Sequence, residues 1–250
     1  MEFHFRYTVS LMSILLVMHI SYMDDSLNMR KHSEWKKLIL THHWPVTVCK
    51  LAEVKCKNLP NYWTLHGLWP DKSQMCNNSW PFDCSEIQDI LPEMNKCWPD
   101  LFHQNHSVFW KHEWQKHGTC AASLPCLNSQ HNYFSKGLEM YSNVDLNSVL
   151  VKSGIKPSNT YQMKEIEDAI VNVYGVVPKI QCLPPQQGGD PQILGQIEIC
   201  FSKDFKLINC TETSDEVLMT EDEPQINWKA YHEELHVCDN HINTFYPPVQ

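Results

Sequence analysis

The sequence lacks the marks of several large classes of protein. It has 20 lysines and arginines against 29 aspartates and glutamates, so there is no basic excess to hold nucleic acid over a broad surface. It has no C-x-x-C pair, which argues against a zinc ribbon or a thioredoxin-like site. It also has no internal repeat. Beyond its first 22 residues no run approaches about 20 apolar residues, so we expect a mature chain without a membrane span.

The composition is that of one exported domain. The 250 residues are 42% hydrophobic and 20% charged, which is globular, and they suffice for one core. Residues 1–22 are predicted to be a signal peptide, because Arg6 precedes an apolar run from Val9 to Ile20 that is too short to span a bilayer. Residues 23–34 are polar and expected to be flexible, which leaves 35–250 as a single domain.

One stretch concentrates side chains that can do chemistry. The segment F-W-K-H-E-W-Q-K-H-G-T-C begins at Phe109 and is predicted to form a helix that ends at Gly118. At about 100° per residue, an arc of about 140° carries four polar side chains, those of His112, Glu113, Lys116 and His117. Phe109 falls inside this arc, whereas Trp110 and Trp114 fall on the flank that can face a core.

The four polar side chains suit phosphate chemistry. A histidine takes or gives a proton near neutral pH. A lysine or a protonated histidine stabilises charge that builds on phosphoryl oxygens. Two other interpretations compete. A mixed-charge helix face is most often a solvated surface. A zinc site is disfavoured, because His112 and His117 are five positions apart and the H-E-x-x-H pattern needs four.

A second segment, W-T-L-H-G-L-W-P-D from Trp63 to Asp71, is predicted to begin as a strand and to end in a Trp-Pro-Asp turn. Taken alone, His66 in this strand would more often be a core or surface histidine. Together, the two segments resemble the two active-site segments of the ribonuclease T2 family, in its animal secreted or lysosomal branch. The likeness runs from Trp35 to the closing F-Y-P-P at residues 245–248.

The resemblance implies a fold and a set of catalytic roles. The fold is α+β, a single domain with a mostly antiparallel sheet, several flanking helices and disulfide staples. The resemblance makes His117 the base and His66 the acid, although the sequence by itself does not fix which histidine takes which role. It also implies that Glu113 and Lys116 stabilise the pentacovalent phosphorane, and that His112 helps to bind phosphate.

The resemblance also implies two base-binding sites. Trp69 and Asp71 correspond to the first site, where Trp69 offers a stacking face, and Phe109 corresponds to the second. Core packing is an equally common role for a tryptophan such as Trp69. In many family members a glutamine just before a Trp-Pro dipeptide helps to hold the second base. Here the residue just before the Trp-Pro dipeptide is His43, and His42 precedes it. The base preference at the second site is therefore open.

The implied activity is that of a metal-independent endoribonuclease. RNA carries its own nucleophile, the 2′-OH, which DNA lacks. We therefore expect a single-stranded RNA substrate, products with 2′,3′-cyclic phosphate ends, and no DNA, metal or cofactor. Protonation of all 14 histidines would change the formal net charge from −9 to +5, so we expect tighter RNA binding in mild acid. The alternatives are a zinc hydrolase and a secreted glycoprotein of the same fold that acts mainly by binding or signalling.

The expected location follows from the signal peptide and from analogy with the family. We expect passage through the endoplasmic reticulum lumen to lysosomes or to the extracellular space, as a monomer with at most peripheral membrane contact. Three N-x-S/T sequons predict glycosylated surface loops, at Asn77, Asn105 and Asn209.

The 11 cysteines indicate an oxidising compartment. The family pattern implies four pairs: Cys49–Cys56, Cys76–Cys120, Cys182–Cys238 and Cys200–Cys210. Cys84, Cys97 and Cys126 are left over. If 85–97 is helical, Cys84 and Cys97 lie about 19 Å apart, beyond the about 7 Å that a disulfide allows. We therefore expect Cys126 to join one of them, or free thiols.

The remaining secondary structure follows from periodicity and turn residues. A first strand is expected after Trp35–Leu40, and residues 72–84 and 211–227 are expected to be surface segments. Three further helices are predicted, at 85–98, 131–150 and 164–174. Three further strands are predicted, at 179–183, 195–202 and 205–210. Helices and strands in separate runs favour an α+β fold with an antiparallel sheet.

Overall fold

The structure, a computed structural model, describes residues 35–52, 56, 58–210 and 235–249. The chain divides into two units, residues 1–35 and 36–250, and nearly all of the described residues belong to the second. The predicted signal peptide, the segment 23–34 and the acidic segment 211–227 lie outside the described residues. Within the described ranges, no helix is both long enough and apolar enough to cross a membrane.

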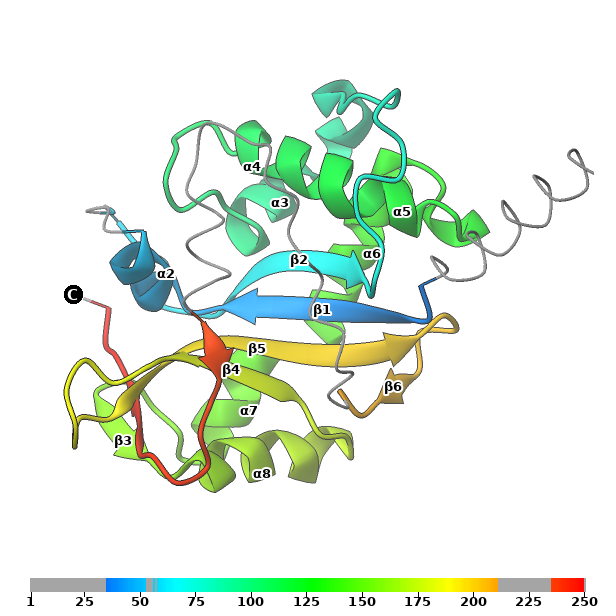
Figure 1. Cartoon of the computed structure of the whole chain (residues 1–250). Helices are drawn as coiled ribbons and strands as arrows, with labels where there is room; N and C mark the ends of the chain where they lie inside the picture. Colours follow the sequence, from blue (N-terminus) through cyan, green and yellow to red (C-terminus); the bar gives the residue numbers. More distant parts are fainter. Residues whose placement is uncertain (1–34, 53–55, 57, 211–234, 250) are drawn as a thin grey trace, which may run out of the picture. The chain divides into compact units, whose positions relative to one another are not determined.

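The centre of the fold is an eight-stranded sheet in which β5 lies between β1 and β4 (Figure 1). Its main path runs β2-β1-β5-β4-β7, and each neighbouring pair on that path is antiparallel. The path strands are β1 (Lys37–His43), β2 (Thr64–Pro70), β4 (Lys179–Leu183), β5 (Gln192–Ser202) and β7 (His236–Val237). Three short strands complete the sheet: β3 (Asn159–Tyr161), β6 (Leu207–Ile208) and β8 (Thr244–Tyr246). Only the β5–β8 pair is parallel, so the predicted α+β class is confirmed.

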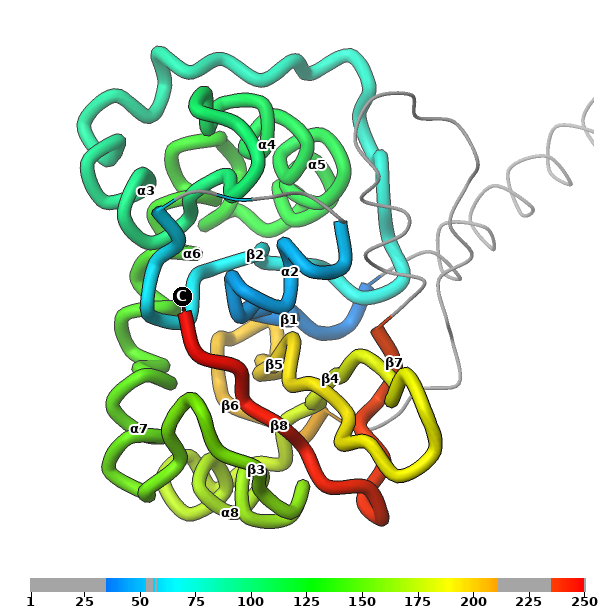
Figure 2. The backbone as a smooth tube through the Cα atoms, turned by 90° about the vertical axis from the view of Figure 1, so that its left-hand side faces the viewer, coloured from blue at the N-terminus to red at the C-terminus, as the bar shows by residue number. Residues whose placement is uncertain are grey.

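The helices gather at the two ends of this sheet. Figures 1 and 2 show α3, α4 and α5 on the β2 side and α7 and α8 on the β4 side. The helices are α2 (Pro45–Leu51), α3 (Leu91–Cys97), α4 (Ser107–Glu113), α5 (Thr119–Ala121), α6 (Gln130–Asn143), α7 (Leu146–Lys152) and α8 (Met163–Tyr174). Three short elements differ in hydrogen bonding: the 3₁₀ helices η1 (Cys84–Ile90) and η3 (Pro125–Leu127) and the π turn η2 (Trp114–Gly118).

Two predicted helices differ from the structure in their boundaries. The helix expected at 131–150 is divided into α6 and α7, because the Asp145 side chain accepts from the Ser148 N–H and caps a new helix. The helix expected at 85–98 is η1 followed by α3. A non-helical Ile87 (φ −122°) interrupts η1, and Pro92 lies in the first turn of α3, where its missing N–H is not needed. By contrast, α8 ends at a left-handed Gly175 (φ 71°), as its sequence predicts.

Four disulfides fix the fold, and they are the same four pairs that the family resemblance implies. Cys76–Cys120 ties the loop after β2 to the end of the helix that carries Lys116 and His117, and closing 44 positions contributes about 4 kcal/mol in the chain-entropy model. The three remaining cysteines are free thiols in the structure: Cys84, buried Cys97 and exposed Cys126. We expected either a disulfide between Cys126 and one of the other two or free thiols, and the structure has free thiols.

Candidate active site

The strand half of the site is an edge strand whose outer carbonyls are covered by aromatic side chains. β2 is the first strand on the main path of the sheet, and among the residues that the structure describes one side of its backbone has no strand partner. Trp98 Nε1 donates to the His66 carbonyl at 2.7 Å, and Tyr133 Oη donates to the Leu68 carbonyl at 2.9 Å. Trp98 directly follows α3 and Tyr133 belongs to α6, and together they hold the backbone of β2 around His66, a residue that is 1% exposed.

The helix half of the site contains a distortion that the sequence did not predict. α4 passes directly into the π turn η2, in which i→i+5 bonds replace i→i+4 bonds. The wheel at about 100° per residue therefore does not describe the positions of His112 and His117. The helical path also continues through Gly118 (φ −60°, ψ −41°) into α5, so the prediction that the helix ends there is wrong.

Burial separates the four polar side chains of the helix into two kinds. Glu113 and His117 are buried, whereas His112 and Lys116 are half-buried. Trp110 and Trp114 are buried, as expected of the core flank. Phe109 was expected among the polar residues but is wholly buried, with its ring 5.7 Å from that of His66. The interpretation of this segment as a solvated surface is therefore wrong.

Trp69 joins the two halves. Its ring lies edge-on to His66 at 4.7 Å between centroids and stacks on His117 at 5.0 Å with an interplanar angle of 26°. Its Nε1 donates to Glu113 Oε2 at 2.8 Å. One indole thus contacts both histidines and the carboxyl group. The structure brings together the three side chains for which the resemblance implies catalytic roles.

Gly67 explains how these groups approach so closely. A Cβ atom at this position would lie 1.9 Å from Trp69 Nε1 and 2.4 Å from Glu113 Oε2. No side chain fits there, because the helix and the indole occupy the space beside the strand. The glycine of the T-L-H-G-L-W-P segment is therefore a packing requirement of the site. The sequence analysis missed it, and its position directly after His66 was the available signal.

Burial shifts the protonation of the site in opposite directions. Burial lowers the pKa of His66 to about 3; a hydrogen bond that its ring donates to Gln196 opposes this shift, and the charges of His112 and Lys116 add to it. Burial lowers the pKa of His112 to about 4, with Lys116 as a second cause. Burial raises the pKa of Glu113 to about 8, against the Trp69 hydrogen bond and the charge of Lys116. Glu113 is therefore protonated in acid and able to donate a hydrogen bond.

The residues that the resemblance gives to base binding are buried in this structure. Trp69 packs between the histidines, as described, and Phe109 has no exposed surface. Asp71 has a structural contact: its Oδ1 accepts from the backbone N–H groups of Lys36 and Lys37, which ties the end of β2 to the start of β1. Base binding by these three residues stays a prediction, and stacking on Phe109 requires movement of the residues that cover it.

The two histidines before Trp44 are core residues. His42 stacks on Tyr141 at 5.4 Å, and the ring of His43 lies 5.0 Å from that of His66. Both are fully buried, and burial lowers the pKa of each. His43 therefore packs beside a catalytic candidate and shows no surface to a base in this structure.

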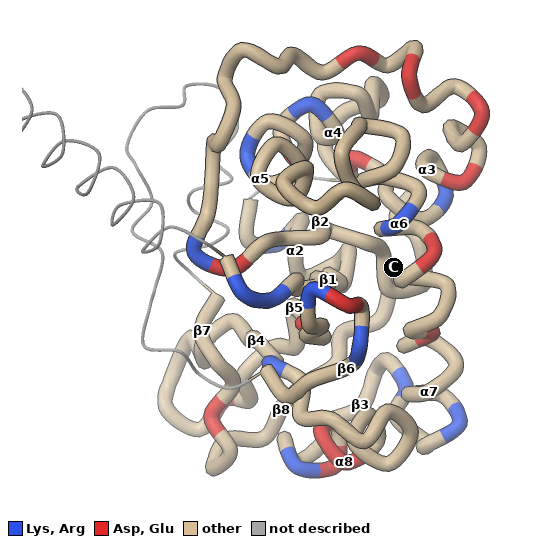
Figure 3. The backbone as a smooth tube through the Cα atoms, turned by 90° about the vertical axis from the view of Figure 1, so that its right-hand side faces the viewer, with Lys and Arg blue, Asp and Glu red and all other residues tan. Residues whose placement is uncertain are grey.

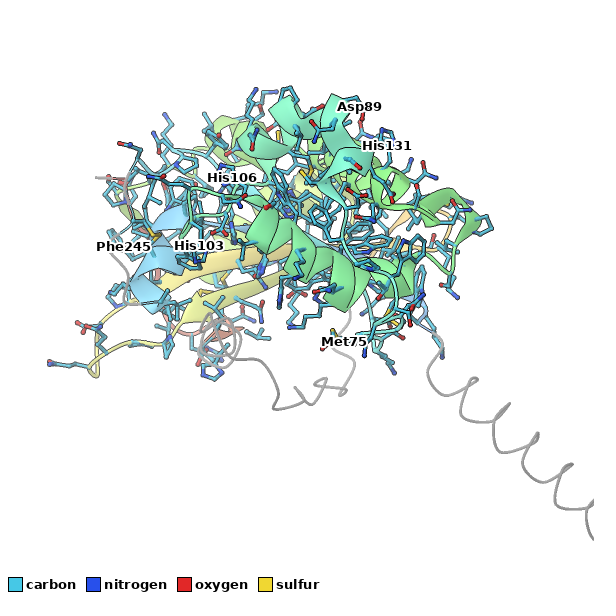
Figure 4. All side chains as sticks on the ribbon, turned by 90° about the horizontal axis from the view of Figure 1, so that it is seen from above. Met75, Asp89, His103, His106, His131 and Phe245 are labelled. Atoms are coloured by element: carbon cyan, nitrogen blue, oxygen red, sulfur yellow. A yellow bond between two sulfur atoms is a disulfide. The ribbon has the colours of Figure 1, made fainter. Side chains whose placement is uncertain are left out.

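Other histidines lie at the surface, away from Trp69. His131 Nε2 lies 2.9 Å from Asp89 Oδ2, and the two side chains face each other in Figure 4. Figure 4 also shows His103 and His106 close together. His103 Nδ1 donates to Asp100 at 2.8 Å, and the Asp100 N–H donates to His106 Nδ1 at 2.9 Å. Within the described ranges, no group of three or more His, Cys, Asp or Glu side chains could hold a metal ion.

The three sequon asparagines are exposed. Asn77 Oδ1 accepts from the Ser79 N–H at 3.0 Å, and Asn105 Oδ1 accepts from both the N–H and the hydroxyl of Ser107. Asn209 Oδ1 instead accepts from the Val177 N–H at 2.8 Å, a bond to a residue distant in the sequence. Glycosylation of all three stays a prediction.

Two imidazoles on facing elements, with a buried carboxyl and a lysine beside them, define an acid–base site of the kind that cleaves phosphodiesters. The model described as Ribonuclease T2 family matches residues 35–210. This chain belongs to the ribonuclease T2 family.

Named relatives agree with this assignment. Ribonuclease T2 of Homo sapiens is 53% identical over 224 residues, covering 88% of this chain and 87% of that protein. Ribonuclease T2 of Danio rerio is 50% identical, covering 92% and 94%. The crystal structure of human RNase T2 superposes with a TM-score of 0.73 at 51% identity, covering 86% of this chain and all of that chain. The chain is thus similar to animal T2 ribonucleases over most of its length.

Proposed function

We propose that this T2-type endoribonuclease cleaves single-stranded RNA by transesterification through the 2′-OH, with His66 and His117 as the proton-transfer pair. The observation that carries the proposal is the shared contact of both imidazoles with one indole, whose N–H is bonded to Glu113. Two groups able to move protons beside one indole can act on one bound phosphodiester, one on the 2′-OH and the other on the leaving oxygen.

The two histidines divide the reaction. His117 takes the proton of the 2′-OH, and the freed oxygen attacks the adjacent phosphorus. The bond from phosphorus to the 5′-oxygen breaks, and protonated His66 gives its proton to that oxygen. The products are a 2′,3′-cyclic phosphate and a 5′-OH. Each proton transfer is expected to contribute about 10²–10⁴-fold.

Glu113, Lys116 and His112 stabilise the phosphorane. Lys116 supplies a positive charge to the phosphoryl oxygens, and His112 binds phosphate at the half-buried side of the helix. Below the pKa of about 8 that burial gives it, Glu113 is a neutral acid. It then donates a hydrogen bond to a phosphoryl oxygen without repelling it.

RNA is held locally in this proposal. Figure 3 shows the lysines of the described residues scattered along the backbone in that view. Such scatter suits recognition of one scissile phosphate and its neighbouring bases better than a broad electrostatic grip. The crystal structure of a variant of RNase MC1, 30% identical to this chain and with a TM-score of 0.64, is a complex with 5′-GMP. We carry over from it only that a nucleotide binds this fold.

The proposal includes an acid-leaning pH dependence. His66 must carry a proton to act as the acid, and burial lowers its pKa to about 3 in the free protein. Raising the pH therefore removes the reactive form. A bound phosphodiester anion offsets the charges of His112 and Lys116, so the pKa of His66 rises in the complex.

The proposed setting is that of an exported monomer. In this proposal residues 1–22 direct export, and the catalytic domain begins at residue 35 and carries out RNA breakdown in lysosomes or outside the cell. The supporting features are the four disulfides, which suit an oxidising compartment, and the exposed sequons.

The test uses purified protein at pH 5 with excess EDTA, single-stranded RNA and DNA of matched sequence, alongside His66→Ala and His117→Ala. We expect cleavage of RNA alone, with 2′,3′-cyclic phosphate ends, and loss of cleavage in both variants. Loss of activity in EDTA would indicate a metal mechanism. An absence of cleavage under all conditions would favour a binding protein of the same fold.

A further inference from the structure

On the sheet side of His66 lies a buried polar group that the reaction above does not use. Gln196 of β5 is 1% exposed, and its Oε1 lies 3.0 Å from His66 Nδ1. We propose that Gln196, itself oriented by Gln181 and Glu198, is a positioning residue that keeps the proton of His66 on Nδ1 and directs Nε2 to the substrate. This inference rests on the proposed role of His66 as the acid.

The orientation of the Gln196 amide is determined by its other neighbours. Its Nε2 donates to Gln181 Oε1 and, at 3.1 Å, to Glu198 Oε1. An amide nitrogen has two hydrogens, and these two acceptors use both. The oxygen of the amide must therefore face His66. An oxygen accepts only, so Nδ1 must be the nitrogen that carries the proton.

The sheet itself assembles this group of side chains. Gln196 and Glu198 are two positions apart on β5, so they lie on the same face. Gln181 and Lys179 of β4 are their direct partners across the antiparallel pair, and His43 of β1 is the partner of Gln196 on the other side. Register therefore brings together residues that are far apart in the sequence.

Glu198 determines which way the Gln196 amide is oriented. It is buried, and its second oxygen lies 3.7 Å from Lys179 Nζ. Burial raises the pKa of Glu198, and the charges of Lys179 and Lys37 oppose this. In either protonation state the carboxyl group retains an oxygen that accepts a hydrogen bond, whereas a second amide could turn round. Glu198 thus makes one orientation of Gln196 better than the other.

This orientation suits an acid that must gain and lose a proton at Nε2. In the imidazolium form both ring nitrogens donate, and Nδ1 continues to donate to Gln196. The opposite amide orientation would place a donor against Nδ1 and disfavour the charged form. Gln196 is neutral, so it holds the tautomer without the strong retention of the proton that a carboxylate would cause.

Other groups that face His66 act by charge or by packing. His43, Trp69 and Phe109 contact its ring, and the charges of His112 and Lys116 act on it from the helix half. These groups remain in place when Gln196 is replaced. A change specific to Gln196 can therefore be separated from their effects.

The experiment combines ¹⁵N NMR of the imidazole groups with pH profiles of RNA cleavage. The His66 signal is assigned by its absence in His66→Ala. In the natural protein we expect neutral His66 with the proton on Nδ1. Gln196→Met keeps the length of the side chain but removes the acceptor oxygen. We expect it to shift the tautomer toward Nε2–H, to lower kcat by about 10–100-fold with little change in KM, and to move the basic limb to lower pH.

Two further variants make the result specific. Gln196→Glu restores an acceptor, so we expect partial rescue and a basic limb moved to higher pH. Gln192→Met is the matched control: Gln192 is buried on the same strand, but it bonds to Asp239, Ile242 and Thr244. We expect it to lower stability while leaving the tautomer and the pH limb unchanged.

The outcomes separate this inference from the proposed function. A natural protein with His66 protonated on Nε2 when neutral overturns the positioning role, even if Gln196→Met does not fold. The same holds if Gln196→Met keeps the natural tautomer and pH profile. If the natural protein does not cleave RNA, the proposed function fails, and the tautomer remains a separate result.

Discussion

The strand and the helix that meet at Trp69 hold their histidines in different ways. His66 is held by hydrogen bonds from distant parts of the chain, with Trp98 on its carbonyl and Gln196 on its ring. The helix half depends on a local change of path, the π turn of η2, and on the Cys76–Cys120 disulfide beside it. The strand thus fixes the position of His66, whereas the helix supplies several charged and titratable side chains.

The same contrast appears in the chemistry. The strand half offers one imidazole that loses its charge on burial, with a pKa of about 3. The helix half offers the proposed base His117, a lysine, a half-buried histidine and a carboxylic acid whose pKa is about 8. A site of this kind separates geometry from electrostatics, so substitutions on the two sides are expected to differ in the kinetic constant that they change.

The largest expected effect tests the histidines of the two halves against each other. His66→Ala removes the acid, so we expect kcat to fall by about 10²–10⁴-fold. His112→Ala removes a half-buried phosphate contact, so we expect about a tenfold loss, mostly in KM. The measurement is steady-state cleavage of a dinucleotide at pH 5. His131→Ala, at a surface pair with Asp89, is the control and should match the natural protein. Equal losses at His66 and His112 would contradict the division of roles.

The second effect concerns Glu113. Glu113→Ala removes the hydrogen bond to the phosphorane and leaves Trp69 Nε1 without its acceptor, so we expect a loss of about 10²–10³-fold in kcat. Glu113→Gln keeps a donor and an acceptor of the same shape and should lose less. Glu139→Ala on α6 serves as the exposed control. If the glutamine variant is as inactive as the alanine variant, the neutral-acid role of Glu113 is wrong.

The third prediction uses pH to distinguish free and substrate-bound His66. Because the free pKa is lowered to about 3, kcat/KM should fall about tenfold for each pH unit above its basic limb. The limb in kcat should lie at higher pH, because bound phosphate favours the charged ring. Profiles of both constants between pH 3 and 8 check this. A rate that rises steadily from pH 5 to 8 would contradict it.

The sequence could predict which candidate residues meet in the site but not the geometry between them. The two motifs placed His66, Glu113 and His117 correctly on a strand and a helix, because their periodicity and turn residues are local signals. The π turn has no such signal, since the same residues suit an ordinary helix. The break at Asp145 was readable in principle, as an N-cap inside a helical pattern.

Other features depend on contacts between distant positions. Gln196 lies 130 residues from His66, and only the register of β5 brings the two together. The burial of Phe109 likewise follows from how the helix packs against the sheet. A helical wheel describes one helix alone and cannot predict that packing. Sequence patterns therefore predicted which chemistry the chain carries, and tertiary packing decided the orientation and pKa of each group.

The smallest expected effect compares the glycine of each half. A Cβ at Gly67 meets Trp69 and Glu113, whereas a Cβ at Gly118 lies 2.3 Å from the Trp114 ring, in the core. Overpacking of either kind costs about 1–3 kcal/mol of unfolding free energy, so both alanine variants should melt at lower temperature.

Only Gly67→Ala displaces the indole that joins the two histidines. We therefore expect Gly67→Ala alone to lower kcat per folded molecule, in addition to lowering the fraction of folded protein. Gly188→Ala is the matched control, since a Cβ there meets no atom within 4 Å. Thermal melts combined with kcat per folded molecule separate the two effects. If Gly118→Ala reduces kcat as much as Gly67→Ala, then the helix half fixes position as firmly as the strand, and the contrast between them does not hold.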